Sequence, residues 1–167
     1  TTAPAGSSVA VTTDRQSCVR LLTTGSVETT LSLKNRQMQV ATHVPYFAVR
    51  VKVDYLQCAG RVGFEDTSTG AFVGFAFGTY SNLMARVTDG SSTGEVDSGV
   101  SGNTTSYLWL KVVGGTFCTF QVNDAPLIAI YTPAVTNWVA PMFGLVGQTT
   151  AEKFLEVDYV EVEYLRS

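Results

Sequence analysis

Hydrophobic and polar residues alternate with a period of two along most of this chain. The clearest run lies at 46–56, where one face carries Phe47, Val49, Val51, Val53 and Tyr55 and the other carries Arg50, Lys52 and Asp54. A period of two puts successive side chains on opposite faces of a β-strand, so the run predicts a strand with one buried face. No segment has the i, i+3, i+4, i+7 spacing of an amphipathic helix. We expect roughly 11 to 14 short strands and no helix longer than about two turns.

The same alternation recurs at 27–34, 83–87, 108–112 and 118–122. Turn-forming residues separate these runs, and they predict turns at Gly60, 68–70, 89–94, 102–103, 114–115 and 123–124. A dozen strands that each bury one face close their core by stacking two sheets. The sequence therefore predicts an all-β fold, an antiparallel two-sheet β-sandwich.

Residues 71–80 differ because neither face of the run is polar. Such a strand is expected in the centre of a sheet, covered on both sides. One face consists of the small residues Gly74, Ala76 and Gly78. These are candidate subunit contacts, since small residues admit a neighbouring backbone. They could equally floor a groove or lie under a loop of the same chain.

The length of 167 residues fits one domain. We expect an extended N-terminal arm at 1–8, followed by a single sandwich domain at 9–167. The arm has a flexible Pro/Gly/Ser-rich composition. Its first residues, Thr1, Thr2, Ala3 and Pro4, are candidate subunit contacts, although docking on the parent domain is the alternative.

Charge and cysteine content exclude several classes of protein. Charged residues make up 15% of the chain, the net charge is −3, and no basic cluster occurs, so we expect no nucleic-acid partner. No run of apolar residues is long enough to span a membrane. The three cysteines, Cys18, Cys58 and Cys118, are odd in number and match no zinc spacing. Buried thiols are expected, with a Cys18–Cys58 disulfide as the alternative.

Several short motifs occur in a characteristic order in the second half of the chain, over about 60% of its length: 62–64 (VGF), 97–100 (DSGV), 107–112 (YLWLKV), 120–124 (FQVND), 141–144 (PMFG) and 155–162 (LEVDYVEV). This order resembles the concanavalin A-like (laminin G-like) jelly-roll domains found in tailed-phage virion proteins, such as decoration, fibre and tail proteins. The resemblance implies a jelly-roll sandwich and a place on the outside of a virion.

The last motif raises the question of catalysis. Glu156, Asp158 and Glu161 form an E-x-D-x-x-E pattern, which resembles the active-site pattern of a glycoside hydrolase family with this fold. The apolar positions shift from odd to even at 159–160, which predicts a β-bulge that gathers these acids and Glu163 on one face. However, a strand with one buried face carries acids on its other face anyway, this strand closes the chain, and no tryptophan flanks the motif. We therefore predict no catalytic residue.

Other chemistry finds little support. His43 is the only histidine and is expected in a turn before Pro45, so a Ser-His-Asp or Cys-His arrangement lacks neighbours. No metal ligands and no cofactor are predicted. Calcium binding by loop acids stays open for Asp66, Asp89, Asp97 and Asp124.

Aromatic residues are the candidates for ligand or partner binding. They lie on the outward faces of strands or in loops, where an aromatic ring can stack on a sugar or anchor a protein interface: Tyr80, Tyr107, Trp109, Phe117 and Trp138. Trp138 is expected in a loop.

The leading hypothesis is a non-enzymatic virion surface protein, a capsid decoration subunit or fibre module that stabilises the particle. Its expected partners are capsid or other virion proteins and further copies of itself, most simply as a trimer, with a cell-surface glycan as a further partner. Its expected location is the virion surface, outside the cell. The second hypothesis is a carbohydrate-binding module that uses aromatics on the concave sheet, and the third is a glycoside hydrolase that uses Glu156, Asp158 and Glu161.

Overall fold

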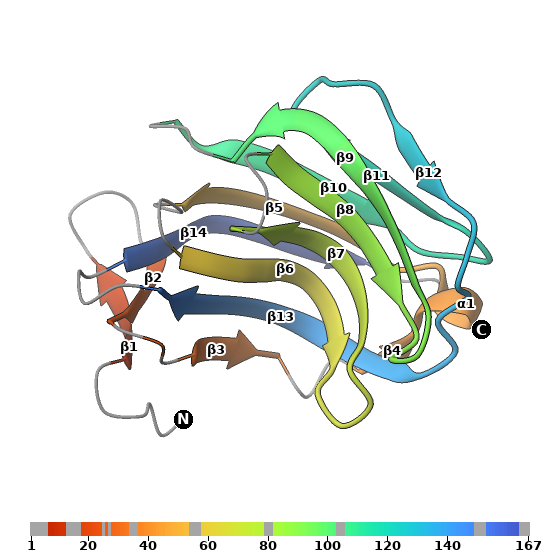
Figure 1. Ribbon diagram of the computed structural model, residues 1–167, viewed down its shortest axis with the longest axis horizontal. Coiled ribbons are helices and arrows are strands. Elements are labelled where there is room, and N and C mark those ends of the chain that lie inside the picture. Colours follow the sequence, from red (N-terminus) through yellow and green to blue (C-terminus); the bar gives the residue numbers. More distant parts are fainter. Residues whose placement is uncertain are drawn as a thin grey trace.

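The computed structural model describes residues 7–12, 18–24, 26, 28–33, 37–53, 58–78, 82–102, 106–148 and 153–163. These residues form 14 strands and one short helix, α1 (Val40–His43). The strands build two antiparallel sheets that pack face to face (Figure 1). The predicted two-sheet β-sandwich is confirmed, and the strand number falls in the expected range.

The first and last strands of the chain lie in the same sheet. Sheet A contains, in spatial order, β1 (Ser7–Thr12), β2 (Cys18–Thr23), β14 (Lys153–Glu163), β5 (Tyr46–Val53), β10 (Leu108–Val113), β11 (Cys118–Val122) and β12 (Ile128–Ile130). Sheet B contains β3 (Glu28–Ser32), β13 (Trp138–Gly147), β6 (Cys58–Asp66), β7 (Ala71–Phe77), β8 (Asn82–Thr88) and β9 (Thr93–Ser101), and β4 (Met38–Gln39) pairs with β13.

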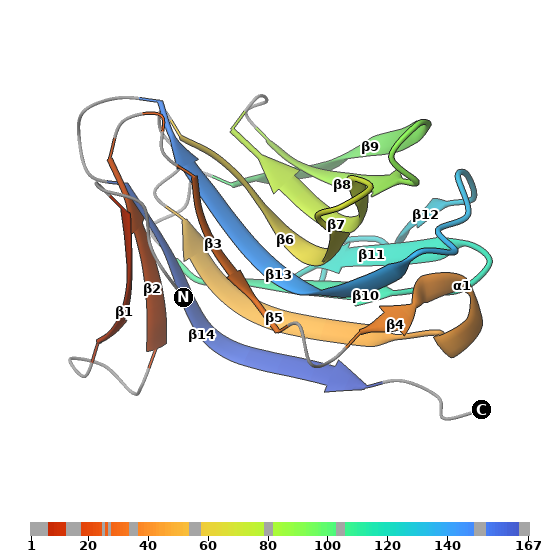
Figure 2. The ribbon, with the colours of Figure 1, turned by 90° about the horizontal axis from the view of Figure 1, so that it is seen from below.

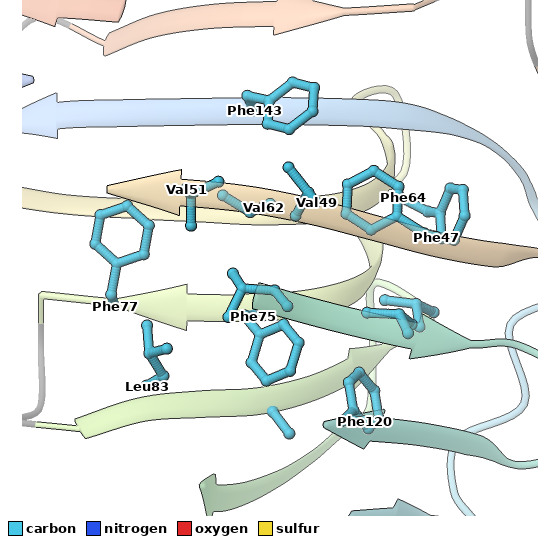
Figure 3. Close-up of a cluster of buried hydrophobic side chains, with 14 of the residues drawn as sticks. Phe47, Val49, Val51, Val62, Phe64, Phe75, Phe77, Leu83, Phe120 and Phe143 are labelled. Carbon is cyan, nitrogen blue, oxygen red and sulfur yellow. The ribbon is translucent and has the colours of Figure 1, made fainter. Parts of the chain in front are cut away.

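The core lies between the two sheets and is formed by the apolar face of each alternating strand. Phe47 of β5 packs against Phe64 of β6 with ring centroids 5.3 Å apart, so this contact joins the two sheets. Phe75 of β7 and Phe120 of β11 make a second such contact, edge to face at 5.6 Å (Figure 3). Aromatic pairs at this spacing add to the stabilisation that burial of their area provides. The alternation seen in the sequence therefore reports inward and outward faces correctly.

Both sheets bend in the same direction. Figure 2 shows β13 and β6 of sheet B, and β5 and β14 of sheet A, curving along their length in parallel. As a result the outer face of sheet B is concave, and the outer face of sheet A is convex. Of the two outer faces, the concave face of sheet B is therefore the one whose shape can surround a ligand.

Strand β7 is the central strand that its composition predicts, since all seven of its residues are buried. On its outer face Gly74 lies directly opposite Gly63 of β6. A Cβ atom added to Gly63 would lie 2.3 Å from the carbonyl oxygen of Val73, and one added to Gly74 would lie 2.3 Å from that of Val62. The two strands therefore approach closely at a point where only glycine fits on both sides.

Several local predictions need correction. Gly60 lies inside β6 and forms no turn. Trp138 begins β13 instead of lying in a loop, because β4 provides a pairing partner for it at Gln39. Strand β1 starts at Ser7, within the segment expected to be an arm. Thr1, Thr2, Ala3 and Pro4, the predicted contacts of that arm, lie outside the described residues.

The three cysteines are buried thiols, which confirms the first of the two alternatives. Within the described part of the chain, no helix has the length and apolar character needed to cross a membrane.

Candidate functional site

The concave outer face of sheet B carries a group of charged residues over a floor of small ones. The strand registers put these charged residues on one face: Glu28, Arg61, Glu65, Arg86, Glu95 and Asp97. Between them lie small residues, including Gly63, Gly74, Ala76 and Gly144. Phe72 and Met142 lie on the same face, and the Phe72 ring covers Gly74, so the floor is only partly free of side chains.

Arg61 and Glu65 form an ion pair along the same strand, with Nε and Oε2 2.9 Å apart. Residues four apart in a strand are separated by about 13 Å at the backbone. Both side chains therefore extend toward each other over Gly63.

The same guanidinium reaches a second carboxylate on another strand. Arg61 Nη2 donates to Glu28 Oε1 of β3 at 3.0 Å. Strand β13 separates β3 from β6, and it has Gly144 opposite Arg61. A Cβ atom on Gly144 would lie 3.4 Å from Arg61 Cγ and 3.6 Å from Glu28 Oε1. The contact that crosses β13 therefore passes over a second glycine.

Glu65 is the buried member of this group, with 7% of its surface exposed. Although Arg61 Nε is close to Oε2, the geometry is not that of a hydrogen bond, and both buried atoms lack a hydrogen-bond partner among the described residues. Burial raises the pKa of the Glu65 carboxyl, and the negative charge of Glu28 raises it further, while Arg61 opposes the rise. Glu65 is therefore a carboxyl group that favours the protonated form more than an ordinary glutamate does.

A second ion pair lies beside the first. Arg86 of β8 donates through Nε and Nη2 to Glu95 Oε1 of β9, at 2.9 and 2.6 Å. Arg61, Arg86 and Glu28 line a hollow of about 150 Å³ together with Ala59, Gly60, Ala76, Phe77 and Val146. The hollow lies between the arginines, so a ligand in it would contact guanidinium groups and a carboxylate at once.

The E-x-D-x-x-E motif lies on the opposite, convex face. Strand β14 contains the predicted bulge, one residue earlier than expected, between Val157 and Tyr159. Glu156 is buried, forms an ion pair with Arg20, and accepts a hydrogen bond of 3.0 Å from the Tyr107 hydroxyl. Asp158 binds Arg50 at 2.7 Å. Arginines bind both acids on this convex surface, so the acids do not line a cleft.

Tyr107 shows the effect of this network on a neighbouring group. Burial raises the pKa of the Tyr107 phenol to about 12, and its hydrogen bond to Glu156 contributes to the rise. A phenol with such a pKa stays protonated and acts as a donor to Glu156. The contact is a structural link between the start of β10 and β14.

The structure separates the predicted aromatic candidates. Tyr107 and Trp109 lie together on the convex face, and Trp109 packs edge to face against Tyr159 at 5.3 Å. Phe117 packs on Tyr131 at 5.3 Å beside the edge strand β12. Trp138 packs on His43 at 5.6 Å near α1. Tyr80 lies outside the described residues. The register puts Trp138 on the same side of β13 as Ala140, which lies opposite Glu65, so Trp138 is at the end of the concave face. The other three described candidates lie in or next to strands of sheet A.

The small residues of β7 have a different place. Gly74 and Ala76 form part of the floor of the concave face, and Gly78 follows the strand with a positive φ of 100°. Of the alternatives, a groove floor agrees with this geometry. Contact with a second subunit stays a prediction, as do the expected partners and location.

The loop acids and His43 have local structural roles. Asp66, Asp89 and Asp97 accept hydrogen bonds from the backbone N–H of Ser68, Ser91 and Gly99, at 2.9, 2.8 and 2.7 Å. His43 lies at the end of α1, where Nδ1 accepts a hydrogen bond from the Gln39 N–H. Across the described side chains, no three His, Cys, Asp or Glu residues are grouped as metal ligands.

Sequence reasoning missed the residues that converge on the concave face: Glu28, Arg61, Glu65, Arg86 and Glu95. One signal was available in 62–65, where a glutamate follows two apolar residues and a glycine in a strand that is otherwise buried. A charge in such a position requires a partner, and the partner must extend over the glycine.

Known structures share this fold. No protein-family model and no curated protein sequence matches the chain. A Bacillus licheniformis β-glucanase is 12% identical, with a TM-score of 0.66 over 95% of this chain and 82% of that one. Alginate lyase A1-II′, of polysaccharide lyase family 7, is 10% identical, with a TM-score of 0.64 over 95% and 84%. The Crh5 transglycosylase is 8% identical, with a TM-score of 0.68 over 98% and 85%. The fold is thus a concanavalin A-like jelly roll.

These comparisons correct the predicted function. The hypothesis of a non-enzymatic virion surface protein is wrong, because solved structures that share the fold include a glucanase, a lyase and a transglycosylase, which are carbohydrate-active enzymes. Nothing in the comparisons supports a bacteriophage or capsid context. The reason for the error is physical. Two-residue alternation reports which side chains face the core, and a sandwich has the same core whether or not its outer face performs catalysis.

Proposed function

We propose that this protein is a carbohydrate-active enzyme that cleaves glycosidic bonds of a neutral polysaccharide bound along the concave face of sheet B. Glu65 is the acid of this reaction, and Glu28 is the carboxylate that faces it across Arg61. Glycosidic cleavage commonly uses two carboxyl groups in different protonation states, one to protonate the leaving oxygen and one to attack or to activate water.

One observation carries the proposal: a buried carboxyl and an exposed carboxylate share one guanidinium. Glu65 is buried and its pKa is raised, whereas the Glu28 side chain is 44% exposed. A carboxyl whose pKa is raised by burial can hold the proton that the leaving oxygen takes, and a second carboxylate beside it can act as nucleophile or base. The Arg61–Glu65 contact lacks hydrogen-bond geometry, so the guanidinium can turn toward Glu28 and leave Glu65 Oε2 to a sugar oxygen.

The charge of the face favours a neutral substrate. Among its described residues, Arg61 and Arg86 face four carboxyl groups, those of Glu28, Glu65, Glu95 and Asp97. The face is therefore net negative when these groups are ionised, and it would repel a polyuronate such as alginate. A β-glucan, the substrate class in the name of the B. licheniformis enzyme, fits this charge better.

The experiment compares products from two polysaccharides. The protein is incubated with soluble mixed-linkage β-glucan and with alginate, and new reducing ends are measured, together with transfer of β-glucan to a fluorescent acceptor oligosaccharide. We expect hydrolysis or transfer with β-glucan and no product with alginate. Glu65→Gln and Glu28→Gln should lower the rate by about 10²-fold or more, in the range typical of lost acid or base catalysis.

Glu163→Gln is the matched control, because Glu163 is an exposed glutamate at the end of β14 on the convex side. It should keep the wild-type rate. The proposal is wrong if β-glucan bound at saturating concentration gives no product, or if Glu65→Gln retains full activity. Release of unsaturated ends from alginate would instead assign a lyase.

A further inference from the structure

The convex face of sheet A carries a pair of exposed aromatic rings. Trp109 of β10 and Tyr159 of β14 are 38% and 43% exposed, and their ring centroids are 5.3 Å apart at an interplanar angle of 61°. Both residues lie opposite Arg50 of β5, one on each side, so the two rings meet above the strand that separates them. The two rings meet edge to face, and together they form one exposed aromatic surface, the platform.

The platform is held in place from below. Arg50 does not extend between the rings toward solvent but lies 4.7 Å over the Tyr107 ring and binds Asp158 at 2.7 Å. The backbone N–H of Trp109 donates to Asn123 Oδ1 at 2.8 Å, and the backbone N–H of Asn123 donates to the Trp109 carbonyl at 2.7 Å. These contacts fix the backbone under Trp109, so a ligand that stacks there need not order it.

Polar groups border the platform. Tyr107, Lys111, Asn123 and Asp124 line an open hollow next to Trp109. They offer hydrogen-bond donors and acceptors at the edge of an aromatic surface. The charged groups around the rings are net negative, since Asp124, Asp158, Glu161 and Glu163 outnumber Arg50 and Lys111.

We propose that this surface is a second glycan-binding site, which binds hexose units of a neutral glycan by stacking on Trp109 and Tyr159. Sugar rings have apolar C–H faces and a rim of hydroxyls, so they match an aromatic platform with polar edges. A protein partner fits less well, because a stable interface needs a large, contiguous contact area with an apolar centre. The net negative charge around the rings argues against a polyanion. This site is independent of catalysis on the concave face.

The two tryptophans of the chain allow a direct test. In a Trp138→Phe variant Trp109 is the only tryptophan, and in a Trp109→Phe variant Trp138 is. Each is titrated with oligosaccharides of mixed-linkage β-glucan in a Glu65→Gln background, which prevents turnover. Tryptophan emission should change with saturation in the first variant, whereas a change in the second would report binding beside Trp138, at the end of the concave face. Binding on the concave face would not reach Trp109, so the two sites are distinguished.

Affinity electrophoresis through gels that contain β-glucan provides the second measurement. Trp109→Ala and Tyr159→Ala should each weaken retention by about tenfold, the size expected for loss of an aromatic stacking partner. Phe117→Ala, a matched loss of an exposed aromatic ring at 46% exposure, should bind as the wild type does. Unfolding midpoints measured on every variant identify any that do not fold. Constant Trp109 emission during the titration, or full retention of a folded Tyr159→Ala variant, overturns the proposal.

Discussion

Glu28 and Glu65 contact the same guanidinium, that of Arg61, although they lie on strands separated by β13. Arg61 passes over Gly144 to reach Glu28 and over Gly63 to reach Glu65. The pair joins the fold to the proposed chemistry, because it puts a buried acid beside an exposed carboxylate.

Glu65→Gln should raise stability at neutral pH while it abolishes activity. The folded-state pKa of Glu65 lies above its ordinary value of 4.5. The stabilising contribution of the protonated carboxyl is therefore fully present below that value and is lost as the pH rises through the folded-state pKa. Glutamine stays neutral throughout.

Thermal unfolding between pH 4 and 8 tests whether the Glu65→Gln variant is more stable than the wild type. The midpoint of the variant should exceed that of the wild type above the folded-state pKa, by about 2–4 °C for each kcal/mol recovered, and the difference should shrink toward pH 4. A variant that is less stable than the wild type at pH 7 would mean that the Arg61 ion pair outweighs the cost of burial.

Glu156→Ala should have the opposite profile, a loss of stability with activity retained. Glu156 is buried and holds Arg20 and the Tyr107 hydroxyl. Removal leaves those groups without their acceptor, which costs about 1–3 kcal/mol. Urea unfolding measures the change, with Glu163→Ala as an exposed glutamate for comparison. A fall in the catalytic rate per folded molecule would mean that the active site lies on the face that carries the E-x-D-x-x-E motif.

Gly74→Ala should destabilise the sandwich far more than Gly144→Ala. A Cβ on Gly74 would lie 2.3 Å from a backbone oxygen, whereas one on Gly144 meets only side-chain atoms at 3.4 Å or more. Overpacking against backbone that cannot move costs about 1–3 kcal/mol, and an ordinary van der Waals contact costs little. Denaturant midpoints of the two variants provide the comparison. Equal midpoints would show that β6 and β7 are not as close as the structure places them.

The Cys118 thiol should resist alkylation in the folded protein. Burial raises the pKa of Cys118 to about 11, so little thiolate forms at pH 8. Iodoacetamide labelling followed by peptide mass analysis should find Cys118 unmodified until urea unfolds the chain. Rapid labelling in the native state would contradict the burial of β11.

The convex face shows how far a linear motif can mislead. The change of alternation phase in 155–164 predicts a bulge correctly, and with it a shared outer face for the acids of the motif, although Glu156 is buried on that face. The motif seemed to lack a tryptophan, yet Trp109 packs on Tyr159, which lies within it. The two residues are far apart in sequence and meet only because β5 pairs with both β10 and β14.

By itself the sequence determined which side chains face the core, because a period of two follows from strand geometry alone. It therefore predicted the two stacked sheets, the fully buried β7 and the bulge in β14. Only the tertiary structure decided which outer face is concave and which residues meet there, since both depend on strand order and on the bending of whole sheets. Glu28, Arg61 and Glu65 look like ordinary outward charges in the sequence. They become a candidate site because β3, β13 and β6 lie side by side and the contacts between them pass over two glycines.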